Sequence, residues 1–252
     1  MKTLNFHRWI FLCVLSLMTA GCTNQNAAIA SLQTAEEVIQ NYEARNDDNY
    51  RISTVSSCAI GQTVDEQNTE HTIQTAENLA YRGNHSFISS SVYDDSFLSE
   101  EHKTYRTYQN NTIEQYEHSS DKDVWQKTNL SENPADFHEF MATLSSIPWS
   151  GCLSTKHGYT LTAEAENCMD LFPVLYDTPE QKQAVAEKAV KFYFDLNCRL
   201  TRIELADVHW ENSSGNTYQY MMYTFSMNFT EYNQVEAAEV KVPAEVRKEA
   251  GQ

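Results

Sequence analysis

The stretch Ala189–Thr230 reads AVKFYFDLNCRLTRIELADVHWENSSGNTYQYMMYTFSMNFT and decides the fold. Apolar and polar side chains alternate along three segments, which are separated by a turn at Asn197 and by the polar loop Asn212–Asn216. In the last segment the larger side chains share one face, and they are Met221, Tyr223, Phe225, Met227 and Phe229. A period of two is typical of strands with one buried face. We therefore predict three consecutive antiparallel strands.

Upstream of this stretch the same patterns predict further strands and three helices. Thr34–Glu37 is a capping box, which begins a helix of about three turns. Pro134–Ser145 has a helical apolar spacing, and Thr178-Pro179-Glu180 begins a helix that we expect to end near Ala189. The expected strands are Tyr50–Ile60, His71–Arg82, Ser86–Tyr93, Thr104–Tyr108, Thr112–His118, Asp123–Lys127 and Tyr159–Glu164.

The N-terminus has the order of an export signal. Lys2 and Arg8 precede the uncharged run Trp9–Met18, and Thr19-Ala20-Gly21-Cys22 follows. The small residues before Cys22 resemble the bacterial lipobox, which implies cleavage before this cysteine and acylation of its sulfur. A plain secretory signal and a retained anchor are the alternatives, but a spanning helix needs about 20 apolar residues. We expect a signal peptide at 1–21, a tether at 22–31 and one domain at 32–252.

Charge narrows the classes of partner. The chain has 35 acidic and 18 basic residues, and its net charge is −17. Cleavage after Gly21 removes two basic residues and no acidic one, so the mature chain is still more acidic. Such a surface repels nucleic acid and anionic lipid headgroups. We therefore expect attachment to the cell membrane or envelope through the acyl anchor, on the extracytoplasmic side, and no nucleic-acid partner.

The cysteine count is even after processing. Cys13 leaves with the signal and Cys22 is the lipidation site, so four cysteines remain: Cys58, Cys152, Cys168 and Cys198. In an exported chain this predicts two disulfides with three possible connectivities. From the alternating directions of the strands, we expect the pairs Cys152–Cys198 and Cys58–Cys168.

Catalytic and metal motifs are weak or missing, and we expect no enzyme, cofactor or metal. His138-Glu139 begins a zincin motif, but Ala142 stands where the second histidine is needed. Ser119–Lys122 matches S-x-x-K, yet it falls in a hairpin turn rather than on a helix. Adjacent acids such as Asp94-Asp95 are usually solvated, and no spaced calcium-ligand series is present.

Three stretches resemble the LolA-like group of exported lipoproteins. They are Tyr116–Lys127, Phe192–Glu204 and Phe229–Val246. In such proteins the first is a hairpin with a tyrosine and a tryptophan, and the second is a strand, a tight turn and a strand. The third ends the last strand before a Val-Pro-Ala-Glu-Val tail. The resemblance implies an α+β fold that is predominantly antiparallel β. It further implies a strongly curved sheet, or half-barrel, with two or three helices packed on its concave face.

Two functions are compatible with this fold. The first is non-enzymatic binding of a hydrophobic or amphipathic ligand, such as a lipid, a lipopeptide or a peptide, in the hollow of the half-barrel. The residues expected to line this hollow are Met221, Tyr223, Phe225, Met227, Phe192 and Phe194. Methionine and aromatic side chains adapt well to flexible apolar ligands. The alternative is an interaction lipoprotein whose core is filled and whose acidic outer face binds an envelope protein.

Overall fold

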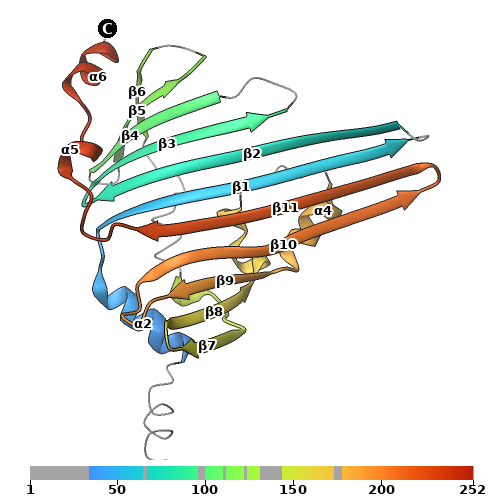
Figure 1. Ribbon diagram of the computed structural model, residues 1–252. Coiled ribbons are helices and arrows are strands. Elements are labelled where there is room, and N and C mark those ends of the chain that lie inside the picture. The colour runs from blue at the N-terminus through green and yellow to red at the C-terminus, as the bar shows by residue number, and fades with distance from the viewer. Residues whose placement is uncertain are drawn as a thin grey trace, which may run out of the picture.

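A computed structural model describes residues 34–64, 67–95, 100–109, 112–121, 124–130, 144–172 and 178–251. Its main feature is one antiparallel sheet of eleven strands in the order β6-β5-β4-β3-β2-β1-β11-β10-β9-β8-β7 (Figure 1). The strands are β1 (Asn49–Val64), β2 (Gln67–Arg82), β3 (His85–Asp94), β4 (Glu100–Gln109), β5 (Thr112–Ser119), β6 (Gln126–Leu130), β7 (Gly151–Thr155), β8 (Gly158–Glu164), β9 (Ala189–Phe194), β10 (Leu200–Ser214) and β11 (Thr217–Thr230). Two meanders, β1–β6 and β7–β11, are joined where β1 pairs with β11.

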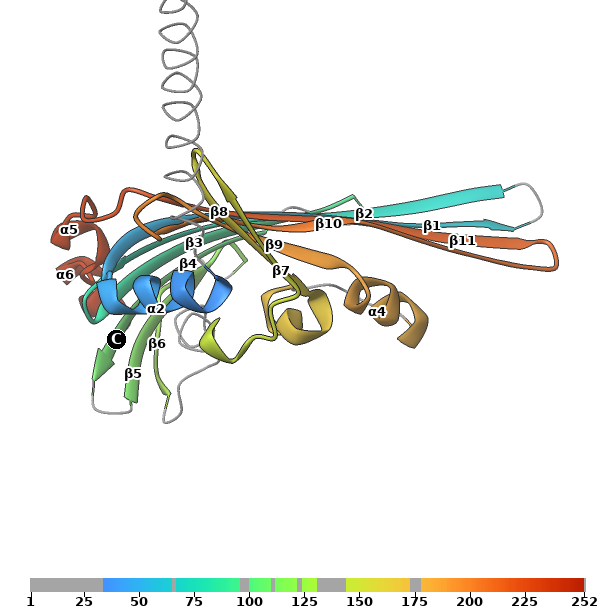
Figure 2. The same ribbon diagram turned by 90° about the horizontal axis from the view of Figure 1, so that it is seen from below.

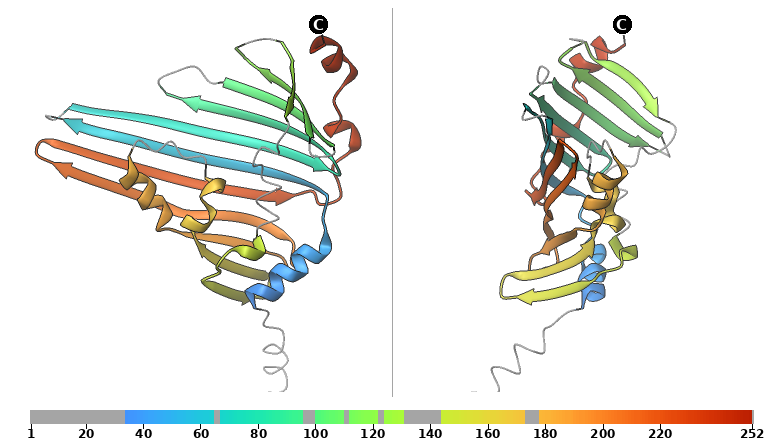
Figure 3. Two further views of the ribbon diagram at one scale, coloured as in Figure 1. Left: turned by 180° about the vertical axis from the view of Figure 1, so that it is seen from behind. Right: turned by 90° about the vertical axis from the view of Figure 1, so that its right-hand side faces the viewer.

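The sheet is strongly curved, and short helices lie on its concave face (Figures 2 and 3). These are the α-helices α2 (Ala35–Arg45) and α4 (Pro179–Ala186) and the 3₁₀ helices η1 (Leu144–Ser146) and η2 (Ala165–Leu171). They cover the part of the face formed by the second meander. The predicted α+β half-barrel with helices on the concave side is therefore confirmed.

Local sequence explains where the two longer helices begin. Thr34 accepts a hydrogen bond from the Glu37 amide, and the Glu37 carboxylate accepts one from the Thr34 amide. Thr178 and Gln181 form the same reciprocal pair, with Pro179 as the first helical residue. Both caps satisfy amides that a helix start leaves without partners. The second helix ends at Ala186, earlier than predicted, because Ala189 already begins β9.

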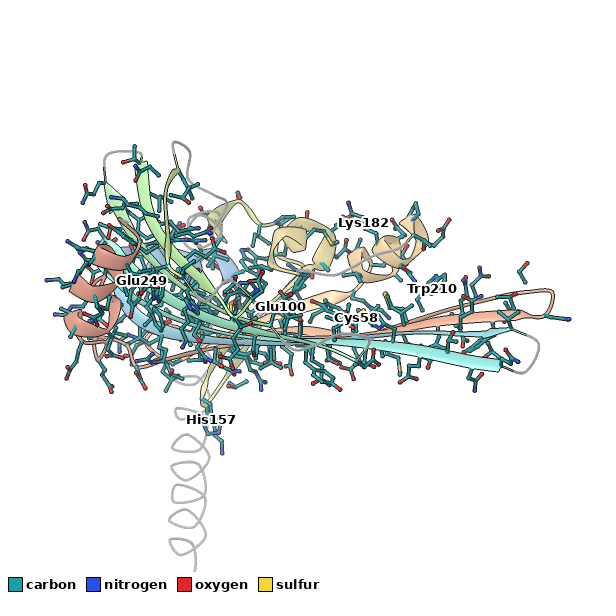
Figure 4. The ribbon with its side chains drawn as sticks, turned by 90° about the horizontal axis from the view of Figure 1, so that it is seen from above. Cys58, Glu100, His157, Lys182, Trp210 and Glu249 are labelled. Carbon is teal, nitrogen blue, oxygen red and sulfur yellow. The ribbon has the colours of Figure 1, made fainter. Side chains whose placement is uncertain are left out.

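The strand register assigns each side chain to a face. Met221, Tyr223 and Phe225 of β11 stand opposite Ile60, Cys58 and Ser56 of β1. All six residues lie on the concave face, since side chains opposite each other in a ladder share a face. In Figure 4, Cys58, Glu100 and Trp210 lie on the side of the sheet that carries Lys182 of α4, whereas His157 projects from the other side.

The C-terminal segment packs against the convex face. The α-helices α5 (Ala237–Val240) and α6 (Ala244–Glu249) follow β11, and sequence patterns did not predict them. Val240 packs with Ala80 of β2, and Val246 packs with Tyr116 of β5. The Arg51 guanidinium pairs with Glu231 and Glu239, each at 2.7 Å. The tail therefore packs on the convex face of the first meander, whereas the other helices lie on the concave face of the second meander.

Most predicted strands are present, but several bounds differ. Strand β1 continues to Val64, and strand β2 already starts at Gln67. Their hairpin is therefore longer than the predicted segments. Strand β7 was not predicted. Of the helix expected at Pro134–Ser145, all but Leu144 and Ser145 lies outside the described residues, and these two belong to η1.

Candidate functional site

The six residues expected to line the hollow lie together on the concave face and form its apolar floor. Phe192 and Phe194 come from β9, and Met221, Tyr223, Phe225 and Met227 come from β11. All six are buried, with between 0% and 7% of their surface exposed, in one hydrophobic cluster. The apolar floor is therefore filled in this structure, and its role in ligand binding stays a prediction.

Aromatic rings join the apolar floor to the segments that cover it. Phe172, which directly follows η2, meets Phe225 edge to face with ring centroids 4.9 Å apart. Trp149 meets Phe192 in the same way at 5.0 Å, and Tyr42 of α2 meets Phe194 at 5.9 Å. Such pairs add about 0.5–1.5 kcal/mol each beyond simple burial. Three separate short segments thus close over the floor.

A part of the concave face on β2–β5 is polar and accessible. Residues that stand opposite one another on successive strands form a row across the sheet. The row that contains Met227 of β11 and Thr54 of β1 continues through Glu77 of β2, Ser90 of β3 and His102 of β4. None of these last three side chains is buried. The neighbouring rows contribute further ionisable side chains: His71, Asp94, Glu100, Arg106 and Glu117. We call this area on β2–β5 the polar wall.

Glu77 stands at the centre of the polar wall. Desolvation within the curved sheet raises the pKa of its carboxyl group above the ordinary value, and the nearby Arg106 charge opposes this effect. The Arg106 guanidinium is itself held by Gln115, whose Oε1 accepts from Nε at 2.9 Å. Beside them, the hydroxyls of Ser56 and Thr75 are 2.6 Å apart. These groups can hydrogen-bond to a polar headgroup or to a peptide.

The apolar floor and the polar wall form one continuous surface. They meet along β1, whose concave side carries Ile52, Thr54, Ser56 and Cys58. Sequence alternation identified the floor, because its residues are large and regularly spaced. It missed the wall, because charged residues on a strand read as a solvated outer face unless the register is known.

The cysteines do not form the predicted disulfides in this structure. Cys58, Cys152, Cys168 and Cys198 carry thiols, and only Cys152 is exposed. Burial raises the pKa of the Cys168 thiol to about 12, which makes it a poor nucleophile at neutral pH. Cys22 lies outside the described residues. The lipidation and the disulfide pairs therefore stay predictions.

A groove of about 560 Å³ lies on the other side of the sheet. Strand β6 and helix α6 form it, and its lining residues are Val124, Trp125, Gln126, Lys127, Thr128, Glu249 and Ala250. The Trp125 amide donates to the Glu249 carboxylate at 3.2 Å, which ties the two elements together. This groove is separate from the apolar floor and the polar wall.

Comparisons with known proteins do not identify a family. No family model and no curated protein matches the chain. A crystal structure of a DUF1329 family protein from Desulfovibrio piger aligns over 82% of this chain and 95% of its own, with 9% identity and a TM-score of 0.25. A putative outer membrane lipoprotein-sorting protein domain from Vibrio parahaemolyticus aligns over 82% and 97%, with 8% identity and a TM-score of 0.26. Scores this low do not identify a function.

Within the described ranges, none of the helices has the length and apolar content that crossing a membrane requires.

Proposed function

We propose that this protein is a lipid-anchored, non-enzymatic binding protein of the cell envelope that holds an amphipathic ligand on its concave face. The apolar portion of the ligand lies on the apolar floor, and its polar end lies against Glu77 and Arg106. A lipid, a lipopeptide or an amphipathic peptide has this chemistry. The observation that carries the proposal is the continuity of the apolar floor with the accessible polar wall on one curved surface.

Access to the apolar floor requires the covering helices to move. The cover consists of short segments, of which α2 has 11 residues and α4 has 8, so each buries little area by itself. Elements with few buried apolar contacts open at a lower free energy than the whole domain. An acyl chain that replaces the Phe172 and Tyr42 contacts restores the burial that opening removes.

The anchor places this surface in the envelope. Acylation of Cys22 supplies more than one acyl chain, which stable attachment to a bilayer requires. The nine residues between Cys22 and the domain then act as a short tether, on the predicted boundaries.

The test is to identify molecules that copurify with the protein. We expect organic extraction and mass spectrometry of protein purified from its native envelope to find a lipid or lipopeptide that is not covalently attached. An extract without such a molecule, together with no fluorescence change of an apolar dye, contradicts the proposal.

Two adjacent serines on β3 provide a matched control. Ser90 lies on the concave face in the row of Glu77, whereas Ser91 lies opposite Ala76 on the convex face. We expect Ser90→Trp to reduce the copurified ligand severalfold, because the indole occupies the polar wall, and Ser91→Trp to leave it unchanged. Equal effects of the two variants argue against binding on the concave face.

The filled apolar floor favours a second function, in which the protein binds an envelope protein through its acidic outer surface. The burial of all six floor residues is what this alternative requires. It predicts an empty extract and a specific pull-down of an envelope protein that weakens as the salt concentration rises.

A further inference from the structure

His71 of β2 lies between two consecutive carboxylates at the end of β3. Its Nδ1 is 2.7 Å from Oδ1 of Asp95, and its Nε2 is 3.4 Å from Oδ2 of Asp94. One donor atom from each residue lies within 4.8 Å of the other two. Between a fifth and two fifths of each side chain is exposed, so the cluster is accessible from solvent.

The strand ladder fixes the positions of these groups. Asp94 stands opposite Ile73, which places it on the concave face with His71. The Thr72 amide donates to Oδ2 of Asp95 at 2.9 Å, and the Asp95 amide donates to the Thr72 carbonyl at 3.2 Å. The three side chains are thus held by backbone pairing of β2 and β3.

The chemistry of the imidazole favours a cation here. A neutral imidazole has one N–H donor and one lone pair. With a carboxylate at each nitrogen, the lone pair faces an anionic oxygen unless a proton or a metal ion lies between them. The two carboxylates together carry two negative charges. A divalent ion neutralises both of them, whereas a single proton on the imidazole leaves the cluster with one negative charge.

The distances suit a metal ion. Zn²⁺ binds imidazole nitrogen and carboxylate oxygen at about 2.0–2.2 Å, so two of its ligands in tetrahedral geometry lie about 3.3 Å apart. The separation between Nε2 of His71 and Oδ2 of Asp94 is 3.4 Å. Nδ1 of His71 is 2.7 Å from Oδ1 of Asp95, so the second carboxylate lies beside the same ring.

We propose that His71, Asp94 and Asp95 form a binding site for a divalent transition-metal ion of the Zn²⁺ class. The site has one imidazole and two carboxylates, with a coordination position open to water or to a polar ligand group. It lies on the polar wall, in the row that runs through Ile60 and Met221. The proposal is independent of the ligand suggested for the concave face.

Calorimetric titration of the metal-free protein with ZnCl₂ tests the site, after the thiols have been alkylated so that Cys152 does not bind the metal. We expect one saturable site per chain. His71→Gln and Asp94→Asn should each lower the association constant at least tenfold, and Asp95→Asn should also weaken it. Binding of Co²⁺ should give a visible absorption spectrum that is lost in His71→Gln.

The matched control is His209→Gln on the convex face. His209 faces one carboxylate, with 4.0 Å between its Nε2 and Oε2 of Glu211. This variant should bind Zn²⁺ like the unmodified protein. No saturable Zn²⁺ binding, or equal binding by His71→Gln and the unmodified protein, overturns the proposal. Nitrogen NMR that finds both ring nitrogens of His71 protonated at saturating Zn²⁺ also overturns it.

Discussion

The ring of Phe172 stands edge to face on the ring of Phe225, with 4.9 Å between the centroids and 86° between the planes. Phe225 belongs to the apolar floor, and Phe172 belongs to the segment that covers it. The contact therefore links the stability of the domain to the closure of its concave face.

We expect Phe172→Ala to lower the free energy of unfolding by about 3–5 kcal/mol, because it removes a buried aromatic ring and leaves a cavity. Urea unfolding measures this loss. Tyr93→Ala, which removes an aromatic side chain that is 52% exposed on the convex face, should change the stability by less than about 0.5 kcal/mol. Similar losses for the two variants would mean that Phe172 does not hold the cover in place.

The raised pKa of Glu77 predicts a dependence of stability on pH. In the folded state this carboxyl group binds its proton more tightly than in the unfolded state, since desolvation disfavours the charge. The free energy of unfolding then falls as the pH rises above the ordinary value of 4.5 and through the folded pKa. Glu77→Gln removes this loss.

We therefore expect Glu77→Gln to raise the melting temperature at pH 7 by roughly 1–2 °C, a small gain because solvent screens the group. At pH 4 the variant and the unmodified protein should melt together. The control for the loss of one negative charge is Glu101→Gln. Glu101 lies on the convex face of β4, opposite Ser91 of β3. If Glu77→Gln raised the melting temperature equally at pH 7 and pH 4, desolvation of the Glu77 carboxylate would not be the cause.

The cysteine pairing is tested by peptide mapping without reduction, on protein taken from an oxidising compartment. We expect one linked peptide with Cys152 and Cys198 and another with Cys58 and Cys168. Burial is the main cause of the raised pKa of Tyr159, and the Cys198 and Cys152 thiols add to it, so both lie near its phenol. Cys58 and Cys168 belong to the same buried cluster. Linkage of Cys152 to Cys58 or Cys168 would exclude both predicted pairs, and four alkylated thiols would show that no disulfide forms.

Lipidation is tested at Cys22, with Cys13 as a matched control in the same segment. We expect Cys22→Ser to abolish incorporation of labelled palmitate and to leave residues 1–21 attached, as measured by intact mass. Cys13→Ser should be processed and acylated normally, because this cysteine lies inside the apolar run. A mature mass that is unchanged by Cys22→Ser would contradict the predicted anchor.

Sequence alternation predicted the elements whose periodicity is long enough to read. Met221 to Phe229 gave the last strand and its inner face, and the Thr34 and Thr178 caps gave the two longer helix starts. The tail helices α5 and α6, with 4 and 6 residues, are too short to show a helical period. They form because Val240 and Val246 find apolar partners on the sheet.

Contacts between distant parts of the sheet could not be predicted. The sequence showed Asp94-Asp95 as a pair of adjacent acids, but His71 joins them only through the register of β2 with β3. Likewise, alternation placed Met221 and Phe225 on an apolar face without deciding whether helices fill the space above them. Both features depend on tertiary packing, which a periodic pattern does not contain.

The most direct test of binding on the concave face uses three methionines of β11. Met221 and Met227 belong to the apolar floor, whereas Met222 points to the convex face and is 48% exposed. In methyl NMR with a spin-labelled fatty acid, we predict broadening of the Met221 and Met227 signals and little effect on Met222. Broadening of Met222 alone would place the acyl chain outside the half-barrel and contradict the proposed function.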